Sequence, residues 1–88
     1  MKRIPSKCAV STILSVISPR QNIRIVDFPT LYACTNWEEP TEVYKGKNDL
    51  NSYQYAKITA SQVRGIETHT HSEGSQLVLK ICMVADEY

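Results

Sequence analysis

Both histidines of the chain lie in one short segment, GIETHTHSEG at residues 65–74. On an extended strand, residues two apart point to the same side, so Glu67, His69 and His71 would share one face. Imidazole nitrogens and carboxylate oxygens are zinc ligands, and this spacing lets three of them converge on one ion. The same residues fit a solvent-facing strand that runs into a turn, because no C-x-x-C or H-x-x-x-H pair accompanies them. We favour the hairpin over the metal site, and we expect no cofactor.

A second group of polar residues surrounds the single tryptophan. Glu38 and Glu39 directly follow Trp37, and Glu42 comes shortly after Pro40. Tryptophan often anchors protein interfaces, because it buries a large area and carries a hydrogen-bond donor. A solvated acidic loop is the simpler interpretation, and the two are compatible. The residues that we expect to bind a partner are Trp37, Glu38, Glu39 and Glu42.

Aromatic and basic residues are interleaved between positions 44 and 57. They are Tyr44, Lys45, Lys47, Tyr53, Tyr55 and Lys57. On neighbouring strands such side chains can stack bases and neutralise phosphates, as in proteins that bind single-stranded nucleic acid. The alternative is a tyrosine-rich sheet face with solvated lysines. The net charge of +1 lacks the strong basic excess typical of nucleic-acid-binding domains.

Length and composition indicate a single globular domain spanning residues 1–88, with 42% hydrophobic and 22% charged residues. A chain this short leaves little room for a deep, walled active site. Charge is unevenly distributed, since residues 1–25 hold five of the ten basic residues and none of the nine acidic ones. The sequence therefore has a basic N-terminal part and a mildly acidic remainder.

The three cysteines, Cys8, Cys34 and Cys82, form no close pair, and an odd number does not suit a disulfide framework. We therefore expect a reducing compartment, the cytoplasm. The apolar stretch near the N-terminus is interrupted by polar residues and falls far short of the roughly 20 residues needed to cross a bilayer. We expect neither a targeting signal nor a membrane segment.

The periodicity of apolar residues then predicts the elements that position these groups. Residues 6–18 fit an amphipathic helix and, almost equally well, a strand, because many of them are β-branched. The strand from 76 to 84 is apolar on both faces, as expected for a central strand. The remaining predicted strands are 22–28, 31–35, 41–47, 53–58 and 65–70.

These elements predict an α+β fold: a small, mainly antiparallel sheet or partly open barrel of five to six short strands, with at most one N-terminal helix. An all-β small barrel is the alternative. The function expected is that of a non-enzymatic protein-interaction domain in the cytoplasm, a regulator or inhibitor of another macromolecule. It would bind another protein, or a second copy of itself through a free edge strand. A single-strand nucleic-acid-binding barrel is the alternative function.

Overall fold

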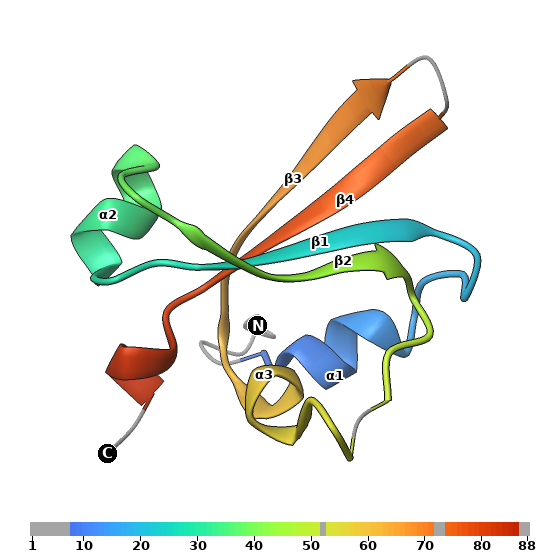
Figure 1. Ribbon diagram of the computed structural model, residues 1–88, viewed down its shortest axis with the longest axis horizontal. Helices are drawn as coiled ribbons and strands as arrows, with labels where there is room; N and C mark the ends of the chain where they lie inside the picture. The colour runs from blue at the N-terminus through green and yellow to red at the C-terminus, as the bar shows by residue number, and fades with distance from the viewer. Residues whose placement is uncertain (1–7, 52, 72–73, 87–88) are drawn as a thin grey trace, which may run out of the picture.

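The computed structural model describes residues 8–51, 53–71 and 74–86. Its strands form one twisted layer, with α1 and α3 beneath it and α2 at one end (Figure 1). In chain order the described elements are α1 (Val10–Leu14), β1 (Asn22–Asp27), α2 (Leu31–Asn36), β2 (Thr41–Lys47), α3 (Ala56–Ala60), β3 (Val63–His71), β4 (Gly74–Ile81) and the 3-10 helix η1 (Met83–Asp86).

The four strands are arranged in the order β2-β1-β4-β3. The central pair, β1 and β4, is parallel, whereas β1–β2 and β3–β4 are antiparallel. The strand predicted to be central is therefore central, although it ends at Ile81, and Val84 lies in η1. One β-bulge interrupts the register at Ile25/Val26, and another lies in β3 between Val63 and Gly65.

The structure confirms a small α+β fold, and several finer parts of the expectation are wrong. The described sheet has four strands instead of five or six, and its central pair is parallel instead of antiparallel. Three short α-helices replace the single one expected. The all-β barrel is also wrong, because the sheet is open and ends in the edge strands β2 and β3.

The segment 31–35, predicted as a strand, is the helix α2. The residue before it decides this, because the Thr30 hydroxyl accepts a hydrogen bond from the Ala33 amide at 3.0 Å. Such an N-cap satisfies one of the amides that the first helical turn leaves without a partner. A five-residue apolar run cannot by itself distinguish a buried helical turn from a strand.

The segment 53–58, also predicted as a strand, is a turn that leads into α3. The Asn51 side-chain oxygen accepts hydrogen bonds from the amides of Tyr53 at 2.8 Å and Gln54 at 3.3 Å. Asparagine commonly bonds the backbone two residues on and so starts a turn. The alternating tyrosines that suggested a strand therefore lie in this turn and at the start of a short helix. Residues 6–18, left open between helix and strand, are helical from Val10 to Leu14.

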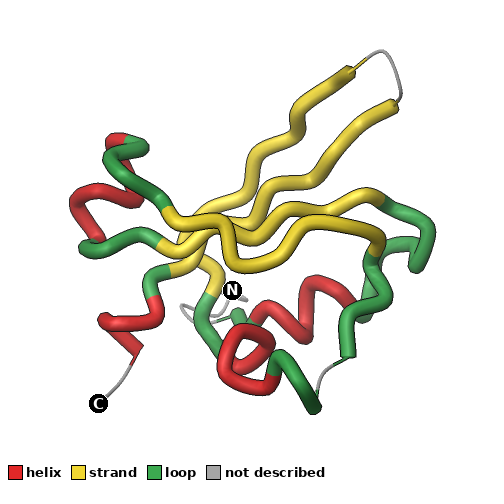
Figure 2. The backbone as a smooth tube through the Cα atoms, in the orientation of Figure 1, coloured by secondary structure: helices red, strands yellow, loops and turns green. Residues whose placement is uncertain are grey.

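The helices α1 and α3 lie beneath the sheet (Figure 2), and the larger apolar cluster contains side chains of both helices and of the sheet. Val10 of α1 packs against the apolar side chains of the two central strands, and none of these residues is solvent-accessible. The sheet residues involved are Ile23, Ile25, Leu79 and Ile81.

The opposite face of the sheet has a smaller apolar cluster, which α2 covers. Trp37, directly after α2, packs against its rim and is partly buried. The cluster makes β4 apolar on both sides, as its sequence predicts. Its members are Val26, Phe28, Ala33, Cys34 and Val78.

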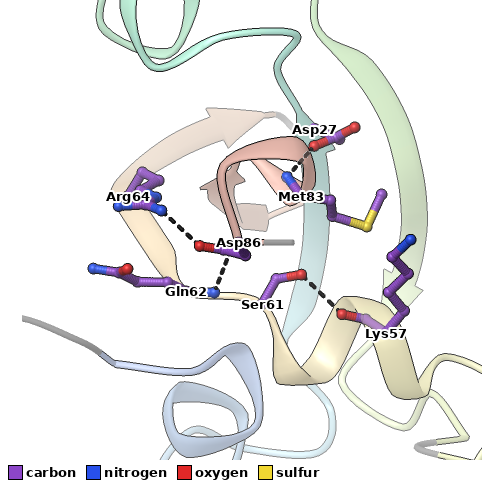
Figure 3. A network of polar contacts seen from close by, with 7 residues as sticks. All are labelled: Asp27, Lys57, Ser61, Gln62, Arg64, Met83 and Asp86. Carbon is purple, nitrogen blue, oxygen red and sulfur yellow. Dashed lines mark hydrogen bonds and ion pairs between the residues drawn. The ribbon is translucent and has the colours of Figure 1, made fainter. Parts of the chain in front are cut away.

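The side chains of Asn48 and Asp86 connect helices to neighbouring segments by hydrogen bonds. The Asn48 amide donates to the carbonyls of Leu14 at 2.9 Å and Ile17 at 3.2 Å, and so satisfies groups at the end of α1. Asp86 of η1 accepts hydrogen bonds from the Gln62 amide at 2.9 Å and from the Arg64 guanidinium at 2.6 Å (Figure 3). The second contact fixes the start of β3.

Candidate functional site

The loop after α2 carries Trp37 over the face of the sheet that α1 and α3 leave uncovered. Trp37 ends the helix in the left-handed region, with φ of 55°, and the Glu38 amide donates back to the Ala33 carbonyl at 3.1 Å. Glycine normally occupies this position, because a Cβ is strained there. The backbone therefore holds a bulky side chain in a costly conformation, and the contacts of its ring offset that cost.

The indole of Trp37 has a partner on each side. Its ring meets Phe28 edge-to-face, with centroids 5.4 Å apart, and the Lys80 ammonium lies 5.1 Å from the ring centroid. Its Nε1 donates a hydrogen bond to Glu67 Oε2 at 2.8 Å. Trp37 thus connects α2 to both β3 and β4.

Glu67 is the polar centre of this cluster. Besides the indole, it receives Lys80 Nζ at 3.1 Å and lies 3.2 Å from His69 Nε2. Hydrogen bonds from Trp37, Lys80 and His69 favour its ionised form and lower the pKa of the carboxyl to about 2. We call Trp37, Glu67, His69 and Lys80 the tryptophan cluster.

The tryptophan cluster contains two of the three residues of the predicted metal site, which are Glu67, His69 and His71. The first two side chains are adjacent, but both oxygens of Glu67 already have partners. The His71 side chain lies outside the described residues. Among the side chains that are described, no three histidines, cysteines or acids are grouped as a metal site would require. A metal at this position stays a prediction.

The predicted partner-binding residues occupy two different places. Glu38 and Glu39 are exposed in the loop beside Trp37, and Glu39 also has a left-handed backbone, with φ of 54°. Glu42 lies on β2 and pairs with Arg24 at 2.7 Å. The sequence does not reveal that Trp37 is half-buried, because its partner Glu67 is distant along the chain.

The tyrosines and lysines proposed to bind nucleic acid do not all lie on one face. Tyr44 and Tyr55 pack edge-to-face, with ring centroids 5.3 Å apart, and Tyr44 belongs to the core beneath the sheet. Lys45, the next residue on the strand, points to the opposite face. Tyr53 is 91% exposed in the turn before α3, to which Lys57 belongs. Nucleic-acid binding by these residues stays a prediction.

The three cysteines are free thiols. Cys34 and Cys82 are buried and Cys8 is partly exposed. Burial raises the pKa of the Cys34 thiol, which is the opposite of what activates a nucleophilic cysteine.

The outer edge of β3 is a feature that sequence reasoning raised only in general terms. The Ile81 carbonyl accepts from the Phe28 amide at 2.9 Å, so Ile81 faces β1. Backbone groups alternate sides along a strand, so Lys80 faces β3, and its partner Gly65 faces β4. Beyond Gly65, the backbone N–H and C=O groups of every second residue point outward from the edge of the sheet. These are Ile66, Thr68 and Thr70.

The two edge strands of the sheet differ in how they resist pairing. On β2, Lys45 and Lys47 flank Gly46, and lysines at an edge discourage the addition of another strand. In β3, residues 66–70 contain no lysine, arginine or proline, and the side chain of Glu67 is engaged by Trp37. Ile66 is 47% exposed. β3 is therefore the edge suited to receive a strand.

The described helices are all too short or too polar to cross a bilayer. Comparisons with protein-family models, with curated proteins and with solved structures found no match to this chain.

Proposed function

We propose that this protein is a non-enzymatic interaction domain, a small cytoplasmic regulator or inhibitor that binds an extended segment of another protein along β3. The observation that carries the proposal is the open edge of β3. The outward backbone groups of residues 66–70 have no strand beside them in the part of the chain described. An added strand would gain backbone hydrogen bonds there, and neighbouring side chains would supply specificity.

The loop at Trp37 supports the same surface and indicates the chemistry of the partner. Non-glycine residues with positive φ, here Trp37 and Glu39, are uncommon and often lie at functional sites. Glu38 and Glu39 are exposed, and the hydrogen bond from Trp37 to Glu67 joins this loop to β3. A partner segment that carries basic residues would complement these carboxylates.

Two hollows lined by described residues are both small. One, of about 220 Å³, lies between α1, α3 and the loop at Asn48, and another, of about 130 Å³, adjoins η1. Both are smaller than the roughly 300–1,000 Å³ of typical small-molecule sites.

The proposal is tested by selecting a phage-displayed library of linear peptides on the purified protein and measuring the affinity of the selected peptides for two variants. Thr68→Pro removes an outward amide, and it should be tolerated because proline is accepted where an edge N–H faces solvent. Thr68→Ala is the matched control, because it keeps that amide. We expect binding to weaken about tenfold or more in Thr68→Pro, since a strand hydrogen bond and the adjacent register are lost, and to persist in Thr68→Ala.

Circular dichroism confirms that both variants are folded. Peptides that bind both variants as tightly as the original protein would place the binding surface elsewhere and overturn the proposal. A failure to select any peptide would do the same.

A further inference from the structure

We propose that β3 pairs antiparallel with β3 of a second copy of this chain, with the Thr68 residues of the two copies opposite each other on a two-fold axis. The self-pairing stands by itself. Its regulatory consequence, that a partner's segment must displace the second copy from the edge, rests on the proposed function.

The outer edge of β3 is open where this pairing is proposed. The Val63 amide donates to the Cys8 carbonyl at 2.8 Å, so the described chain occupies the edge at the start of β3. From Ile66 to Thr70, no strand of the described residues lies beside it. β3 and β4 also extend past the helices beneath the sheet (Figure 1). A second strand can therefore approach this part of the edge.

Backbone geometry restricts the register of the pairing. Ile66, Thr68 and Thr70 direct their N–H and C=O groups outward, so these residues must form the hydrogen-bonded pairs. With Thr68 on the two-fold axis, each Ile66 lies opposite Thr70 of the second copy, and the outward groups of all three residues are used. The neighbouring register, centred on Glu67, would place two carboxylates directly opposite each other, which is unfavourable.

The face of the sheet that carries Trp37 is complementary to itself in this register. Each Glu67 lies opposite His69 of the second copy, in a non-hydrogen-bonded pair, where facing side chains are closest. Glu67 is ionised, because its pKa is about 2, and the Glu67 and His69 side chains are 37% and 40% exposed. Each carboxylate can therefore accept a hydrogen bond from the imidazole of the other copy, in addition to its own.

The other face of the strand carries β-branched side chains that also match their own copies. Ile66, Thr68 and Thr70 are all exposed, and Ile66 is 47% exposed. The two Thr68 side chains would lie side by side, and each Ile66 would pack against the Thr70 methyl group of the second copy. Threonine pairs and contacts between β-branched residues stabilise neighbouring strands. The second copy would thus cover an isoleucine that the single chain leaves exposed.

A pairing over so short a stretch should be weak. It buries less than about 1,200 Å², the lower limit for standard stable interfaces, so the dimer should form only at high protein concentration. A partner's segment that binds the edge more tightly would then replace the second copy. Self-pairing would therefore raise the partner concentration needed for half-saturation as the protein itself becomes more concentrated.

Charges placed on the two-fold axis test the register, and sedimentation equilibrium of the full chain measures the dimerisation constant. Thr68→Lys and Thr68→Glu each place like charges opposite one another. Each variant alone should therefore dimerise at least about tenfold more weakly than the original protein. An equimolar mixture of the two should recover pairing to within about threefold of the original protein, because opposite charges then meet on the axis.

Thr70→Lys and Thr70→Glu are the matched controls. Position 70 lies opposite Ile66 of the second copy, so a charge there does not meet its own copy, and mixing these two variants should give no recovery. Circular dichroism verifies that all four variants are folded. In the original protein, hydrogen exchange followed by NMR should show the amides of Ile66, Thr68 and Thr70 protected at high concentration and exposed on dilution.

Three results would overturn the self-pairing. The original protein could stay monomeric at the highest concentration reached, or the mixed Thr68 variants could pair no better than each does alone. The outward amides could also stay protected at every dilution, in which case another part of the same chain covers the edge.

Competition is read separately from the self-pairing. A peptide selected on the immobilised protein should dissociate the dimer, and a peptide that binds the dimer without dissociating it would contradict the competition. If the dimer forms as described and no peptide can be selected, the self-pairing stands and the proposed function fails. If edge-binding peptides are selected and the chain stays monomeric, the proposed function stands and the self-pairing fails.

Discussion

Replacement of Trp37 by alanine should destabilise the protein substantially. The indole packs on Phe28 at 5.4 Å and covers one rim of the smaller apolar cluster. Truncating a buried tryptophan costs about 3–5 kcal/mol, and the partly buried ring of Trp37 should cost less, roughly 2 kcal/mol. In a domain of this size, 1 kcal/mol shifts the melting temperature by about 4–8 °C, so we expect a decrease of about 8–16 °C.

A glycine variant distinguishes the contribution of the Trp37 ring to stability from the strain of its backbone conformation. Both Trp37→Ala and Trp37→Gly lose the indole, but only glycine adopts the left-handed conformation at φ of 55° without strain. Trp37→Gly should therefore be more stable than Trp37→Ala by about 1 kcal/mol, the reverse of the usual order of these two residues in a helix.

Thermal unfolding followed by circular dichroism measures both variants, and acrylamide quenching of the single tryptophan reports its exposure in the original protein. A decrease of less than about 2 °C in Trp37→Ala would refute the reasoning, because the indole would then contribute nothing to the fold. It would also favour the expectation from sequence that Trp37 is an exposed anchor for a partner.

Hydrogen bonds from Trp37 first, and then from Lys80 and His69, lower the pKa of the Glu67 carboxyl from 4.5 to about 2. The ionised carboxylate therefore stabilises the fold above its unfolded pKa of about 4.5, and this contribution is lost as the pH falls toward 2. Urea midpoints measured from pH 5 to pH 2 should therefore fall more steeply in the original protein than in Glu67→Gln, and parallel curves would contradict the assignment. Asn48→Ala, which removes the amide that holds the end of α1, should lower the free energy of unfolding in urea by about 1–3 kcal/mol. Asn48→Asp, which has no N–H to donate, should be no more stable than Asn48→Ala, and a stable Asn48→Asp variant would show that these hydrogen bonds contribute little.

Strands that alternate clearly in sequence were predictable. The segments predicted at 22–28 and 41–47 correspond to β1 and β2, and the two-sided apolar run in 76–84 identified β4 as central. Alternation carries this information because it decides which side chains enter the core.

The short helices were not predictable in the same way. α2 has six residues and α3 has five, which is too few for a helical period to be distinguished from alternation. Single side chains, Thr30 for α2 and Asn51 for the turn before α3, decide these segments by bonding to backbone amides. The parallel pairing of β1 with β4 was also not apparent, since it depends on a connection through most of the chain.

The candidate site was predicted only in its parts. Trp37 and the pair Glu67 and His69 were selected separately, one as a partner-binding residue and the others as metal ligands. The fold brings all three into one cluster. Thirty positions separate Trp37 from Glu67, and no local pattern encodes a contact over that distance.

The parallel pairing of β1 and β4 also constrains when the protein can fold during its synthesis. Of the described strands, β4 is made last, and it forms one half of the central pair. Until it leaves the ribosome, only the antiparallel pair of β1 and β2 can form, and Ile23, Ile25 and Val26 have no neighbour on one side. Contacts between segments so distant in sequence form slowly. The nascent chain should therefore expose the apolar edge of β1 until β4 is made, and a chaperone that covers exposed apolar segments would act there longest.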